Sequence, residues 1–246
     1  MNLLFELSSE ERMGILFNLK ATKMKLSDLS RKRKLTATEA SRHLQRLSEA
    51  KLIQRDADGF FSLTGYGELS LSLLDSLTFT SANREYFLSH DASGLPDEYK
   101  SRLGDLGACS YQGDVISTLA YDEDMFRAAD SYVWAIADQY HYSARPIVEE
   151  KIRLGVDFRS IFPENVVPPK GFKPAEGVAR RVLPKVDFHI IVTDKEAAFG
   201  LPFMDGRMDY AQFISKDDKF RRWCHDLFQF CWEKAKPVHG PLPNIS

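Results

Sequence analysis

The spacing of apolar residues changes along the chain. Up to about residue 50 they recur every three or four positions, as in helices, and residues 52–64 then alternate between apolar and polar as in strands. Beyond residue 94, short apolar runs alternate with helical segments. The pattern predicts a small N-terminal domain over residues 1–66, a connecting helical segment over 67–93 and an α/β domain over 94–246.

Three helices are predicted in the N-terminal domain. Ser8 or Ser9 is the expected cap of the first helix and Ser27 that of the second. A tight break at residues 35–36 then leads to a third helix that starts at Thr36 or Thr38. Two short helices followed by a third after a short turn form the helix-turn-helix arrangement.

The third helix is amphipathic. Ala40, Leu44 and Leu47 recur at i, i+4 and i+7 and are expected to face the core. Guanidinium, hydroxyl and imidazole groups on the other side suit the edges of bases in a major groove. The residues predicted to contact bases are Thr38, Glu39, Arg42, His43 and Arg46. Taken alone, the same pattern also fits a solvated charged face.

The residues that follow the third helix favour binding in a DNA major groove over a solvated charged face. Strands at 52–56 and 60–64 flank Asp58-Gly59, which predicts a β-hairpin directly after the third helix. The stretch "SRHLQRLSEAKLIQRDADGFFSLTGYG" resembles winged-helix repressors of the ArsR and MarR type, including their Leu-Thr-x-x-Gly ending. The resemblance implies DNA binding, with phosphate contacts at Arg31, Lys32, Lys34, Lys51 and Arg55. Asp56 and Asp58 depart from the pattern and should weaken phosphate contact at the hairpin tip.

Charge is distributed unevenly along the chain. The formal net charge is −2, yet residues 20–55 carry 11 Lys or Arg against three acids, and the remainder carries a net charge of −10. We expect the basic segment to attract a polyanion and the remainder to repel one.

Composition narrows the class of protein further. Hydrophobic residues make up 43% of the chain, as in globular proteins, and no apolar run approaches the roughly 20 residues that span a bilayer. The N-terminus is too short and too acidic for a signal peptide, so we expect a cytoplasmic protein. Three cysteines without CxxC spacing argue against a disulfide framework and a zinc site, and we expect no metal and no cofactor.

The connecting segment is unusually rich in leucine. It carries more leucines than one face of a winged helix can bury: Leu69, Leu71, Leu73, Leu74 and Leu77. We expect this helix to pair two chains, since a single winged helix covers few base pairs. The alternative is that the leucines pack on the C-terminal domain of the same chain.

The C-terminal domain reads as alternating strands and helices. A buried strand "SYVWAIAD", a helix "ARPIVEEKIRLG" and a second buried strand "VDFRSIFPE" predict a βαβ unit with a parallel pair. Four further short strands follow, the middle two expected as a hairpin, and an amphipathic helix closes the domain.

One segment carries a second resemblance. "VDFHIIVTDKEAAFGLP" is similar to the strand-turn-strand of the phospholipase D fold, in which His-x-Lys precedes an acid. With Asp194 as that acid, Asp187 stands where the nucleophilic His would be and His189 where the Lys would be. An aspartate there would repel phosphate, so we expect a catalytically inactive domain and no enzyme. His189 is more simply interpreted as a strand histidine.

The combination resembles the methanogenesis-regulatory family of archaea. "SGLPDEY", "GDVISTL", "WAIADQY" and "EEKIRLGVDFRSIFPE" carry this resemblance. It implies an α+β winged helix-turn-helix followed by an α/β effector domain like that of phospholipase D. It also implies a homodimeric transcriptional regulator that responds to a small molecule, with repression as the expected sign.

An effector pocket is expected at the carboxyl ends of the strands, where α/β sheets bind ligands. Its predicted residues are Trp134, Asp138, Gln139, Tyr140, Tyr142, Arg159 and Phe203. The alternative is that these aromatic residues belong to the core. Two other functions remain open: a phosphodiesterase of phospholipase D or nuclease type with a targeting module, and an interaction or RNA-binding module.

Overall fold

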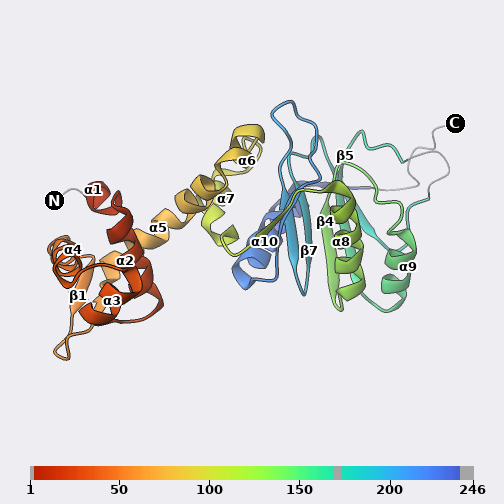
Figure 1. Ribbon diagram of the computed structural model, residues 1–246. Helices are drawn as coiled ribbons and strands as arrows, with labels where there is room; N and C mark the ends of the chain where they lie inside the picture. Colours follow the sequence, from red (N-terminus) through yellow and green to blue (C-terminus); the bar gives the residue numbers. More distant parts are fainter. Residues whose placement is uncertain (1–2, 169–172, 239–246) are drawn as a thin grey trace. The chain divides into compact units, whose positions relative to one another are not determined.

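The computed structural model describes residues 3–168 and 173–238 and divides into two compact units, Met1–Asp75 and Ser76–Ser246 (Figure 1). The division falls within α5 (Gly65–Ala82), which contributes residues to both units. Each unit is described by itself.

The N-terminal unit consists of helices followed by a two-stranded hairpin and the start of α5. Its elements are α1 (Leu3–Leu7), α2 (Glu10–Ala21), α3 (Leu26–Arg33), α4 (Ala37–Glu49), β1 (Ile53–Arg55) and β2 (Phe61–Leu63). The three predicted helices and the antiparallel hairpin are confirmed. The strands are three residues each, and Asp56–Phe60 forms a longer loop than the expected two-residue turn. Helix α1, too short to show a period, was not predicted.

Side chains fix where these helices begin. Ser9 caps α2, since its Oγ accepts the backbone N–H of Arg12 at 3.4 Å. Thr36 caps α4 in a capping box with Glu39. The expected cap at Ser27 is wrong: α3 starts after Lys25, which makes no side-chain cap bond, and Ser27 lies inside the first turn.

A single apolar cluster holds this unit together. Ala40, Leu44 and Leu47 are buried, as their spacing predicted, and Leu44 and Leu47 join a cluster with Leu16, Leu29 and other residues of α2, α3 and the hairpin.

The Leu-Thr-x-x-Gly ending ties the hairpin to α5. The Thr64 hydroxyl donates to the Lys51 carbonyl at 2.6 Å and accepts the backbone N–H of Gly67 at 3.0 Å. Gly67 lies so close to the preceding chain that a Cβ atom there would stand 2.0 Å from the carbonyl oxygen of Leu52. Only glycine allows this approach.

The C-terminal unit is a mixed sheet covered by helices. Its elements are the rest of α5, α6 (Arg84–Ser89), α7 (Asp97–Ser101), the 3₁₀ helix η1 (Leu103–Leu106), β3 (Ser110–Gln112), α8 (Val115–Ala128), β4 (Tyr132–Ile136), α9 (Arg145–Arg153), β5 (Asp157–Pro163), β6 (Ala179–Leu183), β7 (His189–Thr193), β8 (Ala197–Gly200), β9 (Gln212–Ser215), α10 (Asp218–Lys234) and β10 (Lys236–Pro237). The strand order is β10-β6-β5-β4-β7-β8-β9-β3.

Two predicted features of the sheet are confirmed, the βαβ unit and the antiparallel hairpin. Strands β4 and β5 are parallel and joined by α9, as expected for a βαβ unit, and β7 and β8 form an antiparallel hairpin. Asp114 caps α8, accepting the backbone N–H of Ser117 at 2.7 Å.

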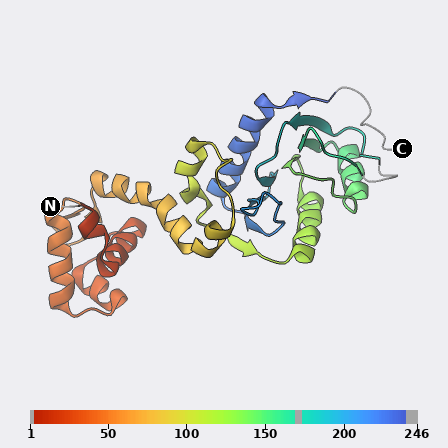
Figure 2. The same ribbon diagram turned by 90° about the horizontal axis from the view of Figure 1, so that it is seen from above.

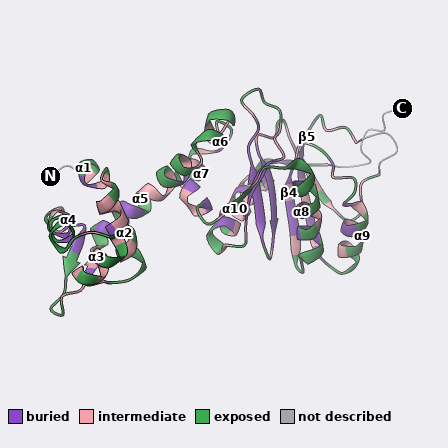
Figure 3. Cartoon of the chain, in the orientation of Figure 1, coloured by how far each residue is buried: buried purple, intermediate pink, exposed green. Residues whose placement is uncertain are grey.

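The two faces of the sheet have different covers. Helix α10 packs on one face, whereas α8 and α9 lie on the other (Figures 1 and 2). Strands β7 and β8 are buried on both sides (Figure 3). Side chains of one strand therefore alternate between a cluster with α10 and a cluster with α8 and α9.

We expect Gly67→Ala to destabilise the N-terminal unit by about 3 kcal/mol, because the new methyl group would overlap backbone that cannot move aside. Urea unfolding followed by circular dichroism measures the change. Gly65→Ala is the matched control: a Cβ there meets nothing within 4 Å, so its stability should stay within about 1 kcal/mol of the parent. Equal effects of the two substitutions would contradict this role of Gly67.

Candidate functional site

The exposed face of α4 is the first candidate site. Thr38, Ser41, Arg42 and Gln45 lie at helical spacing on it, all are exposed, and with Leu26 and Ala37 they line an open hollow beside α3. Thr38 and Arg42 were predicted to belong to this face. Ser41 and Gln45 were not, although the same spacing, three or four residues on, would have found them.

The other three predicted base-contact side chains turn toward the protein. The Glu39 carboxylate accepts the Thr36 backbone N–H at 2.9 Å and its hydroxyl at 2.8 Å, and the first bond lowers the pKa of Glu39. His43 is half-buried, and burial lowers its pKa. Arg46 pairs with Glu6 of α1, and its side chain stays 39% exposed. A base-contact role for these three remains a prediction.

A buried carboxylate holds Arg46. Both oxygens of Glu6, whose side chain is 1% exposed, accept hydrogen bonds from the Arg46 guanidinium, at 2.7 and 3.2 Å. Arg12 pairs with the same carboxylate at 2.9 Å, and the Phe5 ring lies 5.2 Å from the Arg46 guanidinium. The bond from Arg46 lowers the pKa of Glu6. Helix α1 thus ties α2 to the flank of α4.

The five predicted phosphate contacts, Arg31, Lys32, Lys34, Lys51 and Arg55, are all exposed. Lys34 and Lys51 have positive φ angles of 56° and 60°, a left-handed backbone that glycine adopts most readily.

Asp56, one of the two acids that depart from the winged-helix pattern, stabilises the hairpin loop. The Asp56 carboxylate accepts the Phe60 backbone N–H at 2.8 Å and lies 3.6 Å from the Lys23 ammonium. It closes the hairpin loop.

Helix α5 carries an exposed leucine stripe, defined here as Leu69, Leu73 and Leu77. Their exposed fractions are 58%, 74% and 64%, whereas Leu71 is fully buried in the core of the N-terminal unit.

The second candidate site is a cavity of about 390 Å³ in the C-terminal unit, between the sheet and helices α8 and α9. Ala137, Gln139 and Tyr140, which follow the carboxyl end of β4, line it where the effector pocket was expected, and Pro174, Ala175 and Val178, which precede β6, line it as well. Of the seven predicted pocket residues, Gln139, Tyr140, Tyr142 and Arg159 line it.

The other three predicted pocket residues lie elsewhere. Trp134 points to the opposite face, where it stacks on Phe228 of α10 at 5.2 Å. Asp138 accepts a hydrogen bond from the Tyr210 hydroxyl at 3.0 Å, and Phe203 stacks on His90 at 4.8 Å. The error for Trp134 follows from strand alternation: its neighbours Val133 and Ala135 line the cavity.

Arg159 lines the cavity without offering its charge there. Its guanidinium lies 4.6 Å from the Trp134 ring, on the α10 side, and pairs with Asp157 at 2.8 Å.

A buried polar group that the sequence did not reveal borders the cavity. Gln212 Nε2 donates to Asp122 Oδ1 at 2.8 Å, and Asp122 and His189 both line the cavity. Burial raises the pKa of Asp122 to about 7 and lowers the pKa of His189 to about 4. Among the described residues, His189 Nδ1 has no hydrogen-bond partner. The imidazole is therefore neutral at physiological pH and available to a ligand.

The residues aligned with a catalytic set have other partners. Asp187 pairs with Lys185 at 2.5 Å. Asp194 Oδ1 accepts the backbone N–H groups of Asp130 and Ser131 at 3.0 and 3.3 Å.

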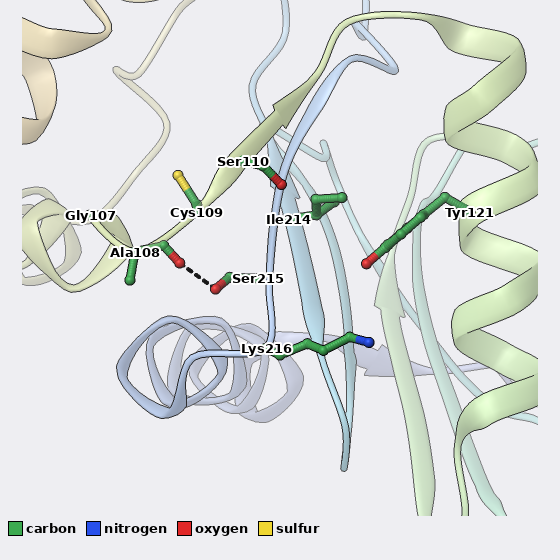
Figure 4. A pocket seen from close by; sticks show the side chains of 8 residues that line it. All are labelled: Gly107, Ala108, Cys109, Ser110, Tyr121, Ile214, Ser215 and Lys216. Carbon is green, nitrogen blue, oxygen red and sulfur yellow. Dashed lines mark hydrogen bonds between the residues drawn. The ribbon is translucent and has the colours of Figure 1, made fainter.

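A further hollow lies beside β3 and β9, where Cys109, Tyr121 and Lys216 are among the lining residues (Figure 4). Burial raises the pKa of the Cys109 thiol, and the Tyr121 hydroxyl donates to Glu196 at 2.5 Å. A thiol with a raised pKa is a poor nucleophile at neutral pH.

Residues 3–168 and 173–238 contain no cluster of His, Cys, Asp or Glu that could hold a metal ion. No helix in those ranges is long and apolar enough to cross a membrane.

Comparison with known proteins gives only distant similarities. No family model matches the chain, and no curated protein matches it. The solved structure of TrmBL2, described as an archaeal chromatin protein with a novel mode of DNA binding, is 13% identical, with a TM-score of 0.44 over 91% of this chain and 92% of that one. Polyphosphate kinase from Porphyromonas gingivalis is 12% identical, with a TM-score of 0.32 over 50% of this chain and 22% of that one. Neither similarity assigns a function.

We expect Glu6→Gln to lower the free energy of unfolding at pH 7 by about 1–3 kcal/mol, because Arg12 loses its charged partner. The folded-state pKa of Glu6 is lowered from 4.5, so its contribution is fully present above that pH and is lost as the pH falls through the folded value. The difference from the parent should therefore shrink in acid. Urea unfolding at several pH values measures it, with the exposed Glu49→Gln as the control. A difference that stays constant down to acid pH would contradict the ion-pair account.

Proposed function

We propose that this protein is a homodimeric DNA-binding transcriptional regulator controlled by a small-molecule effector. The N-terminal unit acts as a winged helix-turn-helix that inserts α4 into the major groove, and the effector binds in the cavity beneath α8 and α9. Repression is the expected sign of regulation.

The observation that carries the proposal is the exposed face of α4. Thr38, Ser41, Arg42 and Gln45 present hydroxyl, guanidinium and amide groups along two to three turns of an amphipathic helix whose other side is buried. A guanidinium suits guanine, an amide suits adenine, and small side chains let a helix approach base edges closely. Arg42 makes no ion pair within the described residues, so its charge is available.

Exposed cations around this face support the same proposal. Lys32, Lys34 and Lys51 form no ion pair among the described residues and lie just before or just after α4 in sequence. Such groups suit phosphates on either side of a groove and provide affinity without sequence preference.

The leucine stripe supports a dimer. Leu69, Leu73 and Leu77 are spaced four residues apart on one face of α5, an arrangement that suits pairing with a second copy of the same helix. Two copies would give the two reading helices that a pair of half-sites requires.

The C-terminal unit is proposed to sense rather than to catalyse. Asp187 and Asp194 serve an ion pair and a backbone turn, and His189 is neutral and buried. A phosphodiesterase needs a nucleophile beside a cation at one phosphate site, and the partners of Asp187 and Asp194 support a sensing role over that one. Turnover of a phosphodiester by the purified chain would overturn this part.

We expect Arg42→Ala to weaken binding to a duplex selected from a random pool by roughly 10- to 100-fold and to leave binding to a scrambled duplex nearly unchanged, because a base contact carries discrimination. Fluorescence anisotropy at fixed salt measures both affinities. Lys34→Ala should weaken both duplexes equally. Arg84→Ala, an exposed arginine of α6 paired with Glu85, serves as the control and should change neither. If Arg42→Ala keeps full discrimination, α4 does not read bases through this residue.

We expect Leu73→Glu to convert the dimer to a monomer, because it places a charge in the middle of the leucine stripe. Sedimentation velocity measures the mass. Leu88→Glu is the matched control, since Leu88 of α6 is 65% exposed and lies off the stripe. A parent chain that sediments as a monomer at micromolar concentration would refute the dimer.

A further inference from the structure

Small side chains form part of the floor of the cavity. The sheet register brings four residues of one face into a row: Arg180, Ser160, Ala135 and Ile191. Ser160 and Ala135, in the middle of the row, leave space between the sheet and helices α8 and α9. Phe126, Phe158 and Phe162 provide apolar walls. Three strand spacings separate Arg180 from Ile191, a span of about 14 Å.

A single uncompensated cation lies at one end. Arg180 is half-buried, its guanidinium donates to the Ala175 carbonyl, and no carboxylate pairs with it among the described residues. Burial lowers the pKa of Arg180, as expected for a positive charge without an ionic partner. The other two arginines at the cavity are neutralised: Arg145 pairs with Glu149 at 2.7 Å and Arg159 with Asp157. Arg180 is therefore the arginine of this cavity that lacks an ionic partner among the described residues.

The opposite end is polar. His189 stands two residues from Ile191 on β7, opposite Gly200 of β8. Gln212 of β9 donates from Nε2 to Asp122, and its Oε1 has no hydrogen-bond partner among the described residues. His189 Nδ1 stays without a partner among the described residues. An unpaired buried nitrogen is costly unless a ligand supplies a hydrogen bond.

We propose that the cavity binds an elongated amphipathic carboxylate, with its carboxylate on Arg180, its apolar body over Ser160 and Ala135, and a hydrogen-bonding group at His189. One buried positive charge matches one negative charge, and a guanidinium fork matches a carboxylate. A phosphate dianion would need a second free cation. A sugar would leave its many hydroxyl groups unpaired against the phenylalanine walls.

Isothermal titration of the full-length chain with octanoate and with octanamide tests the charge. We expect octanoate to bind at least tenfold more tightly than octanamide, because only the acid makes the ionic hydrogen bonds. Arg180→Gln should abolish this preference. Arg145→Gln, at another arginine of the same cavity, should keep it. Equal binding of acid and amide by the parent chain, or no binding of either, overturns the proposal even if Arg180→Gln does not fold.

A second comparison tests the far end. We expect 8-hydroxyoctanoate to bind several-fold more tightly than octanoate, since its hydroxyl can donate to His189 Nδ1. Weaker binding of the hydroxy acid would overturn the hydrogen-bonding role of His189.

The inference rests on the proposed function only in treating this ligand as the effector, and the two can fail separately. Anisotropy with the selected duplex in the presence of octanoate distinguishes them. Octanoate that binds through Arg180 without changing DNA affinity would uphold the ligand class and refute effector control. Tight, specific DNA binding by a chain that binds no carboxylate would uphold DNA binding and refute the ligand class.

Discussion

The side chains of β7 alternate between two helical layers, and the organisation of the C-terminal unit depends on that alternation. Ile190 and Val192 belong to the cluster with α10, whereas His189 and Ile191 face α8 and α9. On this second side small residues leave a cavity. A shift of one residue in register would exchange the two sets and place an imidazole in the α10 core. Sheet register therefore sets both stability and the chemistry of the cavity.

This alternation also explains what sequence could and could not predict in the C-terminal unit. The βαβ unit, the hairpin and the location of the cavity followed from periodicity. Trp134 was assigned to the cavity as an aromatic residue of a buried strand, but strands buried on both sides show no polar face that would tell one side from the other. Asp122 and Gln212 lie 90 residues apart and meet only in the folded sheet.

In the N-terminal unit the local signals were stronger. The helix positions, the buried side of α4 and the hairpin were predicted from spacing and turn residues. Thr38 and Arg42 were correctly placed on the exposed face. Arg46 was not separated from them, because its position depends on an acid from elsewhere in the chain, Glu6. His43 was not separated either, because its partial burial depends on packing that the sequence does not show. Glu6 lies on a five-residue helix that has no periodic signature.

Lys34 and Lys51 keep a left-handed backbone in which glycine would be less strained. Selection for thermal stability alone would favour glycine at both positions, and selection for binding a polyanion would favour lysine. The two pressures oppose each other at the same two residues, on either side of α4. An engineered variant chosen only for heat resistance would therefore be at risk of losing function there first.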